Sequence, residues 1–287
     1  MYVWASARAK THYGLKPVHT FMTLTQNRIT DLFSQKSERL LNVYFTAGFP
    51  QLNDTMTILR GLQAAGVDLV EIGMPYSDPV ADGETIQQSN GKALDNGMSL
   101  KALFDQLEGC RQEQSGDPVT VPILLMGYIN PVLQYGVEAF CKKCQEVGVD
   151  GVILPDLPLD LYLADYAPTF REYGILNVNL ITPQTTESRI RHIDEESDGF
   201  IYMVSSASIT GSTKGISDSM RAYFERIQAM NLRNPRLIGF GINNHDTFDT
   251  ACEYANGAIV GSAFIRHLEE KGTSAESILE FVHTIRA

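Results

Sequence analysis

The sequence predicts an α/β fold of the TIM-barrel class, in which eight parallel strands alternate with helices around one core. Three observations support this prediction. Eight short apolar runs rich in β-branched residues are separated by longer segments with helical periodicity, which is the pattern of repeated βαβ units. The runs are almost continuously hydrophobic, as expected of parallel strands that are buried on both faces. The chain of 287 residues is also long enough for a single barrel, which takes roughly 250 residues.

The eight predicted strands follow one another from residue 40 to residue 263. They occupy residues 40–47, 67–75, 121–129, 150–156, 175–181, 199–206, 235–242 and 257–263. Helical patterns fill intervening segments such as residues 52–65, 137–147 and 218–229. The alternative is an open, doubly wound sheet, which usually carries a GxGxxG turn after its first strand. The first run ends in TAGFPQ, which lacks that turn, so the closed barrel is the favoured prediction.

The first 21 residues differ in character from the rest of the chain. They contain Arg8, Lys10 and Lys16 but no acidic residue, and they lack the apolar segment of a signal peptide. Met22 is followed by TLTQNRITDLF, which has the pattern of an amphipathic helix. We therefore expect residues 1–21 to be an N-terminal extension, either disordered or a mis-assigned start, and residues 22–287 to form a single barrel domain.

The composition excludes several functional classes. A net charge of −11 argues against a nucleic-acid surface, and no apolar run reaches the length of about 18 residues that a membrane span needs. We expect a cytoplasmic protein with no membrane or nucleic-acid partner. Of the four cysteines, only Cys141 and Cys144 are close together. They lie inside a helical pattern and not at its start, where a reactive thiol is expected, so we interpret all four as free thiols.

A carboxylate interrupts the second predicted strand. Glu71 lies in the apolar run VDLVEIGMP, on the same side as Leu69 and Gly73 by the two-residue period of a strand, and should point into the barrel. An unpaired buried carboxylate is costly. The only basic residue on any predicted strand is Arg236, at the beginning of its run, so an ion pair is not the obvious explanation. Burial raises the pKa of a glutamate toward neutrality, which suits proton transfer.

The loop after this strand supplies two further carboxylates. Asp78 and Asp82 lie in PYSDPVADG, where Asp-Pro and Asp-Gly are also ordinary turn sequences. In a barrel this loop leaves the catalytic end of the strand that carries Glu71. At least one of the two carboxylates can therefore fold over the mouth of the barrel and share acid, base or electrostatic roles with Glu71.

Glycine-rich loops after the last three predicted strands indicate a phosphate site. Glycines allow backbone N–H groups to approach phosphate oxygens, and a following helix N-terminus adds its dipole. The loop SSASITGSTKG after the sixth strand can close over a ligand. The residues concerned are Thr210, Gly211, Gly239, Gly241, Gly261 and Ser262, the last two just before the helical stretch AFIRHLEE.

The positions of lysines and histidines narrow the chemistry. All nine lysines fall outside the predicted strands, which leaves a Schiff-base aldolase without an obvious nucleophile. Among the six histidines only His245 follows a strand, so a metal-dependent mechanism is disfavoured and we expect no metal. Acid–base chemistry on a phosphorylated small molecule remains.

These segments together resemble a known family. The run LVEIGMPYSDPVADGETIQ is similar to the signature of tryptophan synthase alpha subunits, and FTAGFP, LMGYINPV, GVDGVILPDLP, YMVSSASITG, GFGI and AIVGSAF follow in the family's order, over about residues 25–286. The resemblance implies cleavage of indole-3-glycerol phosphate to indole and D-glyceraldehyde 3-phosphate. It also implies a pyridoxal-phosphate-dependent beta subunit that receives the indole and condenses it with L-serine in L-tryptophan biosynthesis. The expected assembly is an alpha2beta2 tetramer, with no cofactor in this subunit.

The resemblance assigns roles to individual residues. It implies that Glu71 is the general acid–base and that Asp82 engages the indole N–H. The substrate-binding positions that it implies are Tyr44, Tyr202, Thr210, Gly211, Gly241, Gly261 and Ser262. Ser208 departs from the family's commonest form, a glycine two residues before the loop threonine, and this bears on loop closure. The implied interface with the beta subunit comprises residues 76–82, Asn130, Pro131 and Asp156.

Two rival functions remain open at this point. Another phosphate-binding barrel, such as an indoleglycerol-phosphate synthase or a phosphoribosyl isomerase, shares the fold, although the former is expected to have a catalytic lysine on a strand. A catalytically weak subunit that only activates a partner is the rival from another class. Release of indole from the substrate discriminates between these functions and the implied one.

Overall fold

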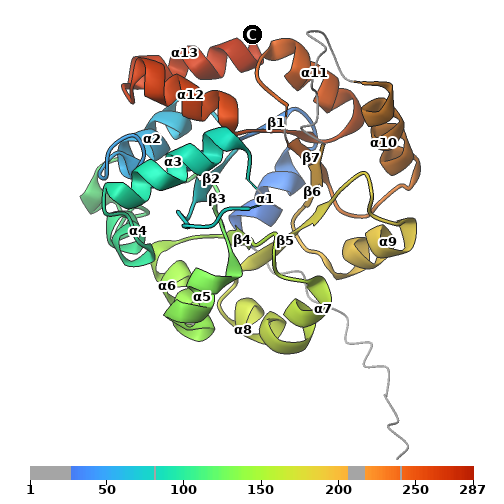
Figure 1. Ribbon diagram of the computed structural model, residues 1–287, viewed down its shortest axis with the longest axis horizontal. Helices are drawn as coiled ribbons and strands as arrows, with labels where there is room; N and C mark the ends of the chain where they lie inside the picture. The colour runs from blue at the N-terminus through green and yellow to red at the C-terminus, as the bar shows by residue number, and fades with distance from the viewer. Residues whose placement is uncertain (1–26, 81, 206–216, 240) are drawn as a thin grey trace, which may run out of the picture.

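The predicted barrel is confirmed. The computed structural model describes residues 27–80, 82–205, 217–239 and 241–287, so the predicted extension and Met22 lie outside the described residues. Eight parallel strands close into a barrel in chain order (Figure 1). The strands are β1 (Leu40–Thr46), β2 (Leu69–Gly73), β3 (Ile123–Met126), β4 (Gly151–Ile153), β5 (Leu176–Ile181), β6 (Ile201–Val204), β7 (Arg236–Gly239) and β8 (Gly257–Val260). Each lies within one of the eight predicted runs.

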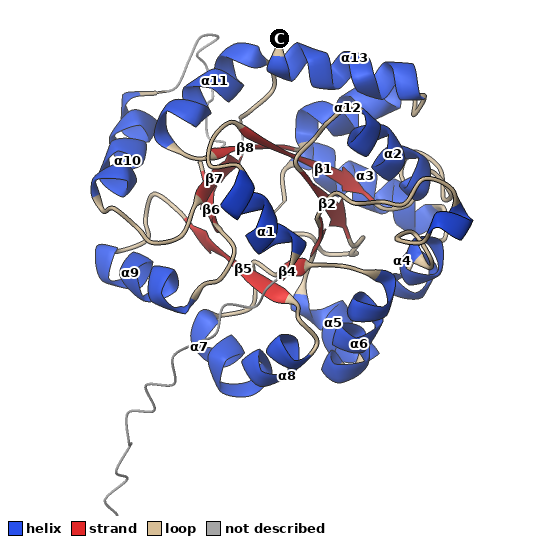
Figure 2. Ribbon diagram, turned by 180° about the vertical axis from the view of Figure 1, so that it is seen from behind, coloured by secondary structure: helices blue, strands red, loops and turns tan. Residues whose placement is uncertain are grey.

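Helices surround the barrel on its outer side, and α1 lies across one end of it (Figures 1 and 2). They are α1 (Arg28–Gln35), α2 (Thr55–Ala64), α3 (Glu84–Asp95), α4 (Leu100–Leu107), η1 (Glu113–Ser115), α5 (Ile129–Tyr135), α6 (Val137–Val147), α7 (Leu159–Leu161), η2 (Tyr162–Tyr166), α8 (Ala167–Glu172), α9 (Glu187–Glu196), α10 (Asp218–Ala229), α11 (His245–Tyr254), α12 (Ser262–Lys271) and α13 (Ala275–Arg286). The predicted helices at residues 137–147 and 218–229 coincide with α6 and α10, and Cys141 and Cys144 are free thiols inside α6. Within the described part of the chain, no helix has the length and apolar character needed to cross a membrane.

Two layers of apolar side chains form the core. One layer packs between the strands and the outer helices. The other fills the barrel and includes Leu69, two residues before Glu71 on the same side of β2, together with Leu124 and Ile153 from the next two strands. This alternation explains how near-continuous hydrophobic runs are buried on both faces. It also confirms that the side of β2 that carries Glu71 faces the barrel interior.

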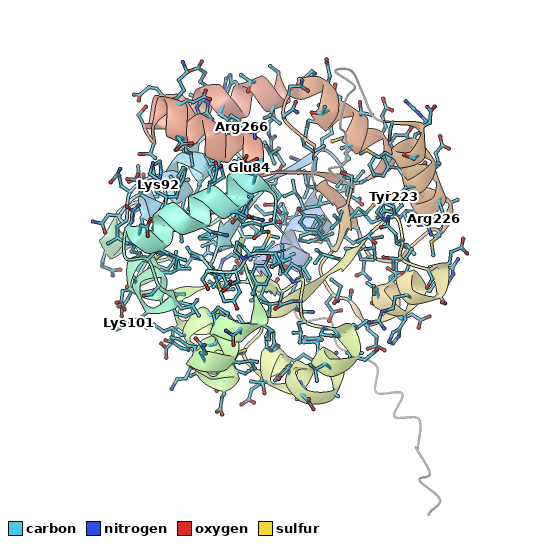
Figure 3. The ribbon with its side chains drawn as sticks, in the orientation of Figure 1. Glu84, Lys92, Lys101, Tyr223, Arg226 and Arg266 are labelled. Carbon is cyan, nitrogen blue, oxygen red and sulfur yellow. The ribbon has the colours of Figure 1, made fainter. Side chains whose placement is uncertain are left out.

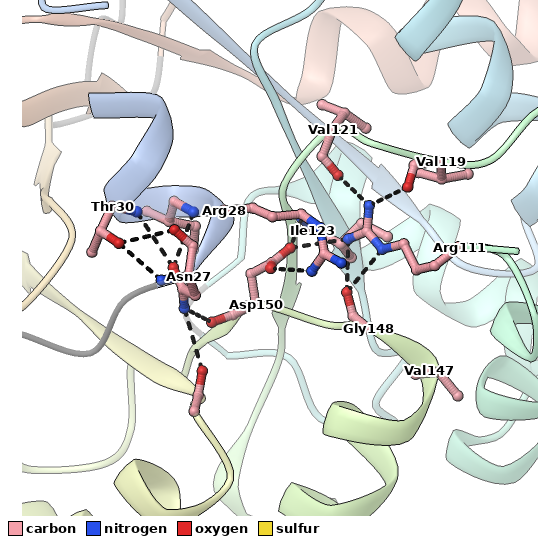
Figure 4. A network of polar contacts seen from close by, with 12 residues as sticks. Asn27, Arg28, Thr30, Arg111, Val119, Val121, Ile123, Val147, Gly148 and Asp150 are labelled. Carbon is pink, nitrogen blue, oxygen red and sulfur yellow. Dashed lines mark hydrogen bonds and ion pairs between the residues drawn. The ribbon is translucent and has the colours of Figure 1, made fainter. Parts of the chain in front are cut away.

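Helix α1 closes the N-terminal end of the barrel, as Figure 2 shows from behind. Its Ile29 is fully buried within the interior layer. The Asn27 side chain caps the helix and also donates a hydrogen bond to the Asp150 carbonyl oxygen at 2.8 Å. The Asp150 carboxylate pairs with Arg28 at 2.8 Å and with Arg111 at 3.0 Å (Figure 4). Helix α1 therefore fills this end of the barrel and is held there by hydrogen bonds and an ion pair. The open end of the barrel is the end at which the strands finish.

Candidate active site

One cavity of about 180 Å³ occupies the C-terminal end of the barrel, where TIM-barrel enzymes carry their chemistry. Its walls come from β1, β2, β3, β6 and β8, from the loops after β2 and β7, and from the first turns of α3 and α12. Seven residues predicted from the sequence line it together: Tyr44, Glu71, Asp82, Tyr202, Gly241, Gly261 and Ser262. Three further residues of the sequence analysis, Thr210, Gly211 and Ser208, lie outside the described residues.

Glu71 is fully buried at the floor of this cavity. It lies opposite Tyr44 in the register of β1 and β2. The side-chain amide of Asn42, also fully buried, donates a hydrogen bond to Glu71 Oε1. Within the described residues, Glu71 Oε2 has no hydrogen-bond partner. Desolvation raises the pKa of Glu71 from 4.5 to about 8, and the Asn42 hydrogen bond opposes this rise. A carboxyl group with such a pKa can both give and take a proton near neutral pH.

Asp82 reaches the same cavity from the loop after β2. Burial raises the pKa of its carboxyl group from 3.8 to about 6, and a hydrogen bond from the Tyr128 hydroxyl at 3.4 Å opposes the rise. The ring of Tyr128 packs against that of Tyr76, with centroids 5.0 Å apart. Asp78, in contrast, is exposed and accepts a hydrogen bond from Ser77 at 2.6 Å. Of the two loop carboxylates, Asp82 is therefore the one that folds over the mouth.

Two buried tyrosines form opposite walls of the cavity. Tyr44 and Tyr202 are 6% and 4% exposed, and burial raises the pKa of both hydroxyl groups, which remain protonated. Each ring lies against a glycine of the next strand: a Cβ atom on Gly73 would lie 2.2 Å from Tyr44 Oη, and one on Gly239 would lie 2.2 Å from Tyr202 Oη. Gly239 is not among the described lining residues, and its role is to make room for Tyr202.

The end of the cavity formed by the loop after β7 and the start of α12 is suited to an anion. Gly241 has a φ of 80°, a conformation that favours glycine. Gly261 is the N-cap of the ten-residue helix α12, whose first residue is Ser262, so the positive end of the helix dipole faces the cavity. Arg266, on the same helix, is the one basic side chain among the described lining residues. Its guanidinium group donates a hydrogen bond to Thr85 Oγ1 at 3.3 Å, and Figure 3 shows it beside Glu84 at the start of α3.

Sequence reasoning missed three polar residues of the site, namely Asn42, Tyr128 and Arg266. A polar residue at position 42 in an otherwise apolar strand was a signal of the same kind as Glu71. Arg266 lies four residues after Ser262, which places both on one face of a helix. Tyr128 gave no comparable signal. Among the described residues, no three His, Cys, Asp or Glu side chains gather as a metal site would require.

Comparisons with known proteins agree with this arrangement. The family model for the tryptophan synthase alpha chain matches residues 31–286. The tryptophan synthase alpha chain of Flavobacterium johnsoniae is 56% identical over 260 residues, which cover 91% of this chain and 100% of that protein. The alpha chain from Legionella pneumophila has a TM-score of 0.79 at 28% identity, covering 91% of this chain and 96% of that one. For a mutant alpha-subunit from Pyrococcus furiosus the TM-score is 0.76 at 34% identity, with coverages of 87% and 98%. This chain therefore belongs to the family of tryptophan synthase alpha chains.

Proposed function

We propose that Glu71 and Asp82 carry out the family's reaction, the cleavage of indole-3-glycerol phosphate to indole and D-glyceraldehyde 3-phosphate, in the cavity at the open end of the barrel. The observation that carries this proposal is the pair of carboxyl groups in one cavity with different surroundings. Glu71 is fully buried and has a pKa raised to about 8, whereas Asp82 has a pKa of about 6 and a tyrosine partner. At neutral pH the first is mostly protonated and the second mostly ionised.

These two states fit the two demands of the reaction. The Glu71 acid donates its proton to carbon 3 of the indole ring, and the resulting carboxylate takes the proton of the neighbouring glycerol hydroxyl. The carbon–carbon bond breaks, the hydroxyl carbon becomes the aldehyde, and the ring regains its aromatic form as indole. Glu71 ends the cycle protonated, as it began, so one carboxyl group serves both transfers. The ionised Asp82 offsets the positive charge that develops on the ring nitrogen.

The remaining lining residues orient the substrate along the cavity. Tyr44 and Tyr202 offer aromatic surfaces to the indole ring. The phosphate goes to the end formed by Gly241, Gly261 and Ser262, where the α12 dipole and Arg266 supply positive charge. Thr210 and Gly211 are proposed to complete this end on the basis of the family resemblance alone.

The proposed partner is a beta subunit in an alpha2beta2 tetramer. The segments that follow β2, β3 and β4 carry exposed apolar side chains: Val80 in the loop after β2 is 87% exposed, Leu133 in α5 46% and Leu161 in α7 42%. Such side chains are typical of protein interfaces. The interface is proposed to include residues 76–82, Asn130, Pro131 and Asp156, whose carboxylate accepts a hydrogen bond from the Ile129 amide at 3.0 Å.

The division of labour between the two subunits completes the proposal. The alpha chain works without a cofactor, pyridoxal phosphate belongs to the beta subunit, and the indole passes between them. Four free cysteines fit the reducing conditions of the cytoplasm, which is the proposed location.

Release of indole tests the proposed function. Purified chain is incubated with indole-3-glycerol phosphate, alone and with a beta subunit, and indole is measured. We expect slow release by the chain alone and faster release with the beta subunit. Binding of a beta subunit without any indole release by the chain would favour a purely activating subunit and would contradict the proposal.

A further inference from the structure

We propose that Asn42 is a positioning residue for Glu71 that serves as its hydrogen-bond partner in both protonation states. The inference rests on the acid–base role of Glu71 proposed above and extends it to a residue with no assigned role. Asn42 is an internal residue of β1, which pairs with β2. It precedes Tyr44 by two residues, so the two side chains leave the same face of the strand. That face is the one turned toward Glu71.

The burial of Asn42 requires an explanation. Its side chain is fully buried, and an amide without compensating hydrogen bonds is costly in an apolar core. The one hydrogen bond that its side chain makes within the described residues runs from Nδ2 to Glu71 Oε1. An apolar residue in its place would suit the interior of the barrel better but would remove the hydrogen bond that Glu71 accepts. The contact with Glu71 is therefore the reason that an amide is useful at this position.

Two buried oxygens next to this contact have no partner within the described residues. They are Asn42 Oδ1 and Glu71 Oε2. Both are acceptors when Glu71 is ionised, so neither can satisfy the other. When Glu71 is protonated, its O–H becomes a donor, and rotation of the amide by half a turn presents Oδ1 as the acceptor. The same side chain thus donates to the carboxylate and accepts from the carboxylic acid.

This dual capacity distinguishes an amide from the cationic side chains that pair with carboxylates. Lysine and arginine only donate, so either would favour the ionised form of Glu71 and hold its pKa down. An apolar neighbour would offer nothing to either form and would leave desolvation unopposed. Asn42 keeps the carboxyl group oriented while its charge changes twice in each catalytic cycle. It acts through Glu71 and need not touch the substrate.

The test replaces Asn42 with leucine, which has a similar size but neither donor nor acceptor. The pH dependence of kcat/KM is measured, and the Glu71 carboxyl group is titrated directly by infrared difference spectroscopy against Glu71→Gln. Both measurements are made in solution. Asn42→Leu loses the hydrogen bond in both protonation states, but the bond to the charged carboxylate is the stronger of the two. We therefore expect the midpoint near pH 8 to rise by about one unit, equivalent to about 1.4 kcal/mol. Asn42→Ala serves the same test if the leucine variant does not fold.

Asn177 provides the matched control. It is a buried asparagine on β5 that hydrogen-bonds Asn179 and does not line the active-site cavity. Asn177→Leu should leave unchanged both the midpoint of the kcat/KM profile and the midpoint of the infrared titration of Glu71. An unshifted Glu71 titration in the Asn42 variants, or an equal shift in the Asn177 variant, would overturn the inference. Full activity of Glu71→Gln would instead refute the proposed function, while the infrared titration would still decide the role of Asn42.

Discussion

Replacement of Glu71 by glutamine should abolish cleavage and remove the pH dependence that Glu71 gives to the stability of the chain. The carboxyl group is fully buried, and its pKa is raised from 4.5 to about 8. Glutamine has nearly the same shape but cannot transfer a proton. Its amide oxygen can still accept the hydrogen bond from Asn42. The substitution therefore removes the proton-transfer group while keeping the cavity filled, which separates the chemistry of Glu71 from its packing.

The sign and size of the stability effect follow from the raised pKa. Between pH 4.5 and pH 8 the folded chain retains a proton that the unfolded chain releases, so the contribution of Glu71 to stability falls as the pH rises. With about 1.4 kcal/mol for each unit, this loss amounts to about 4 kcal/mol between pH 5 and pH 9. Glutamine does not titrate. Its amide N–H group, placed where Oε2 has no partner, adds a cost of about 1–3 kcal/mol at every pH. The variant should therefore be less stable than the native chain at pH 5 and more stable at pH 9.

Urea unfolding at several pH values between 5 and 9, followed by circular dichroism at constant ionic strength, measures this difference. The other titrating groups are common to both proteins and cancel in the comparison. Glu280→Gln, which changes an exposed glutamate on α13, is the control and should show no such trend. A stability difference that stays constant with pH would show that Glu71 is not a neutral acid in the folded chain. Retained indole release by the variant would remove Glu71 from the proton-transfer role.

Three further substitutions probe other parts of the molecule. Asp82→Asn should reduce kcat by about 100-fold, because it removes the charge opposite the ring nitrogen. In the native chain, kcat should decline as the pH falls through about 6, because Asp82 becomes protonated. A plot of kcat against pH for the variant should not show this decline. A Cβ atom on Gly261 would lie 3.6 Å from Tyr44, so Gly261→Val narrows the cavity. The KM for the substrate should rise about tenfold, which corresponds to roughly 1.4 kcal/mol of binding free energy. An unchanged KM would exclude this loop from the phosphate site. Asp150→Asn should destabilise the fold by about 3 kcal/mol in urea unfolding, with kcat and KM preserved; a selective loss of activity would contradict its structural role.

The fold was predictable because its determining features are periodic and local. Strands buried on two faces leave near-continuous apolar runs in the sequence, and β1 to β8 each lie inside one such run. The ends were less predictable: residues 67–75 were assigned to a strand, whereas β2 covers only Leu69–Gly73. Hydrogen bonding to neighbouring strands sets these limits, and a single run of residues does not reveal it.

The site divided in a similar way between predictable and unpredictable residues. Glu71 was recognisable because a carboxylate is unexpected in a barrel strand. The loop that follows offered both Asp78 and Asp82, and the family resemblance singled out Asp82. Asn42, Tyr128 and Arg266 owe their roles to neighbours that are distant in sequence. Asn42 meets Glu71 only through the pairing of β1 with β2, and Arg266 reaches Thr85 only because α12 packs beside α3. Such relationships require the closed barrel.

The buried carboxylates at the two ends of the barrel differ in how many hydrogen-bond and ion-pair partners they have. At the N-terminal end, the Asp150 carboxylate is 1% exposed and is bound by two arginines and by the Ile123 amide at 2.8 Å. At the C-terminal end, Glu71 is equally buried, yet it has one amide partner and an oxygen without any within the described residues. The donors around Asp150 engage both of its carboxylate oxygens, so loss of this carboxylate would leave donors without a partner and would destabilise the chain. A partly paired carboxylate costs stability and can exchange its proton. The plugged end can therefore supply the stability that the open end gives up for catalysis.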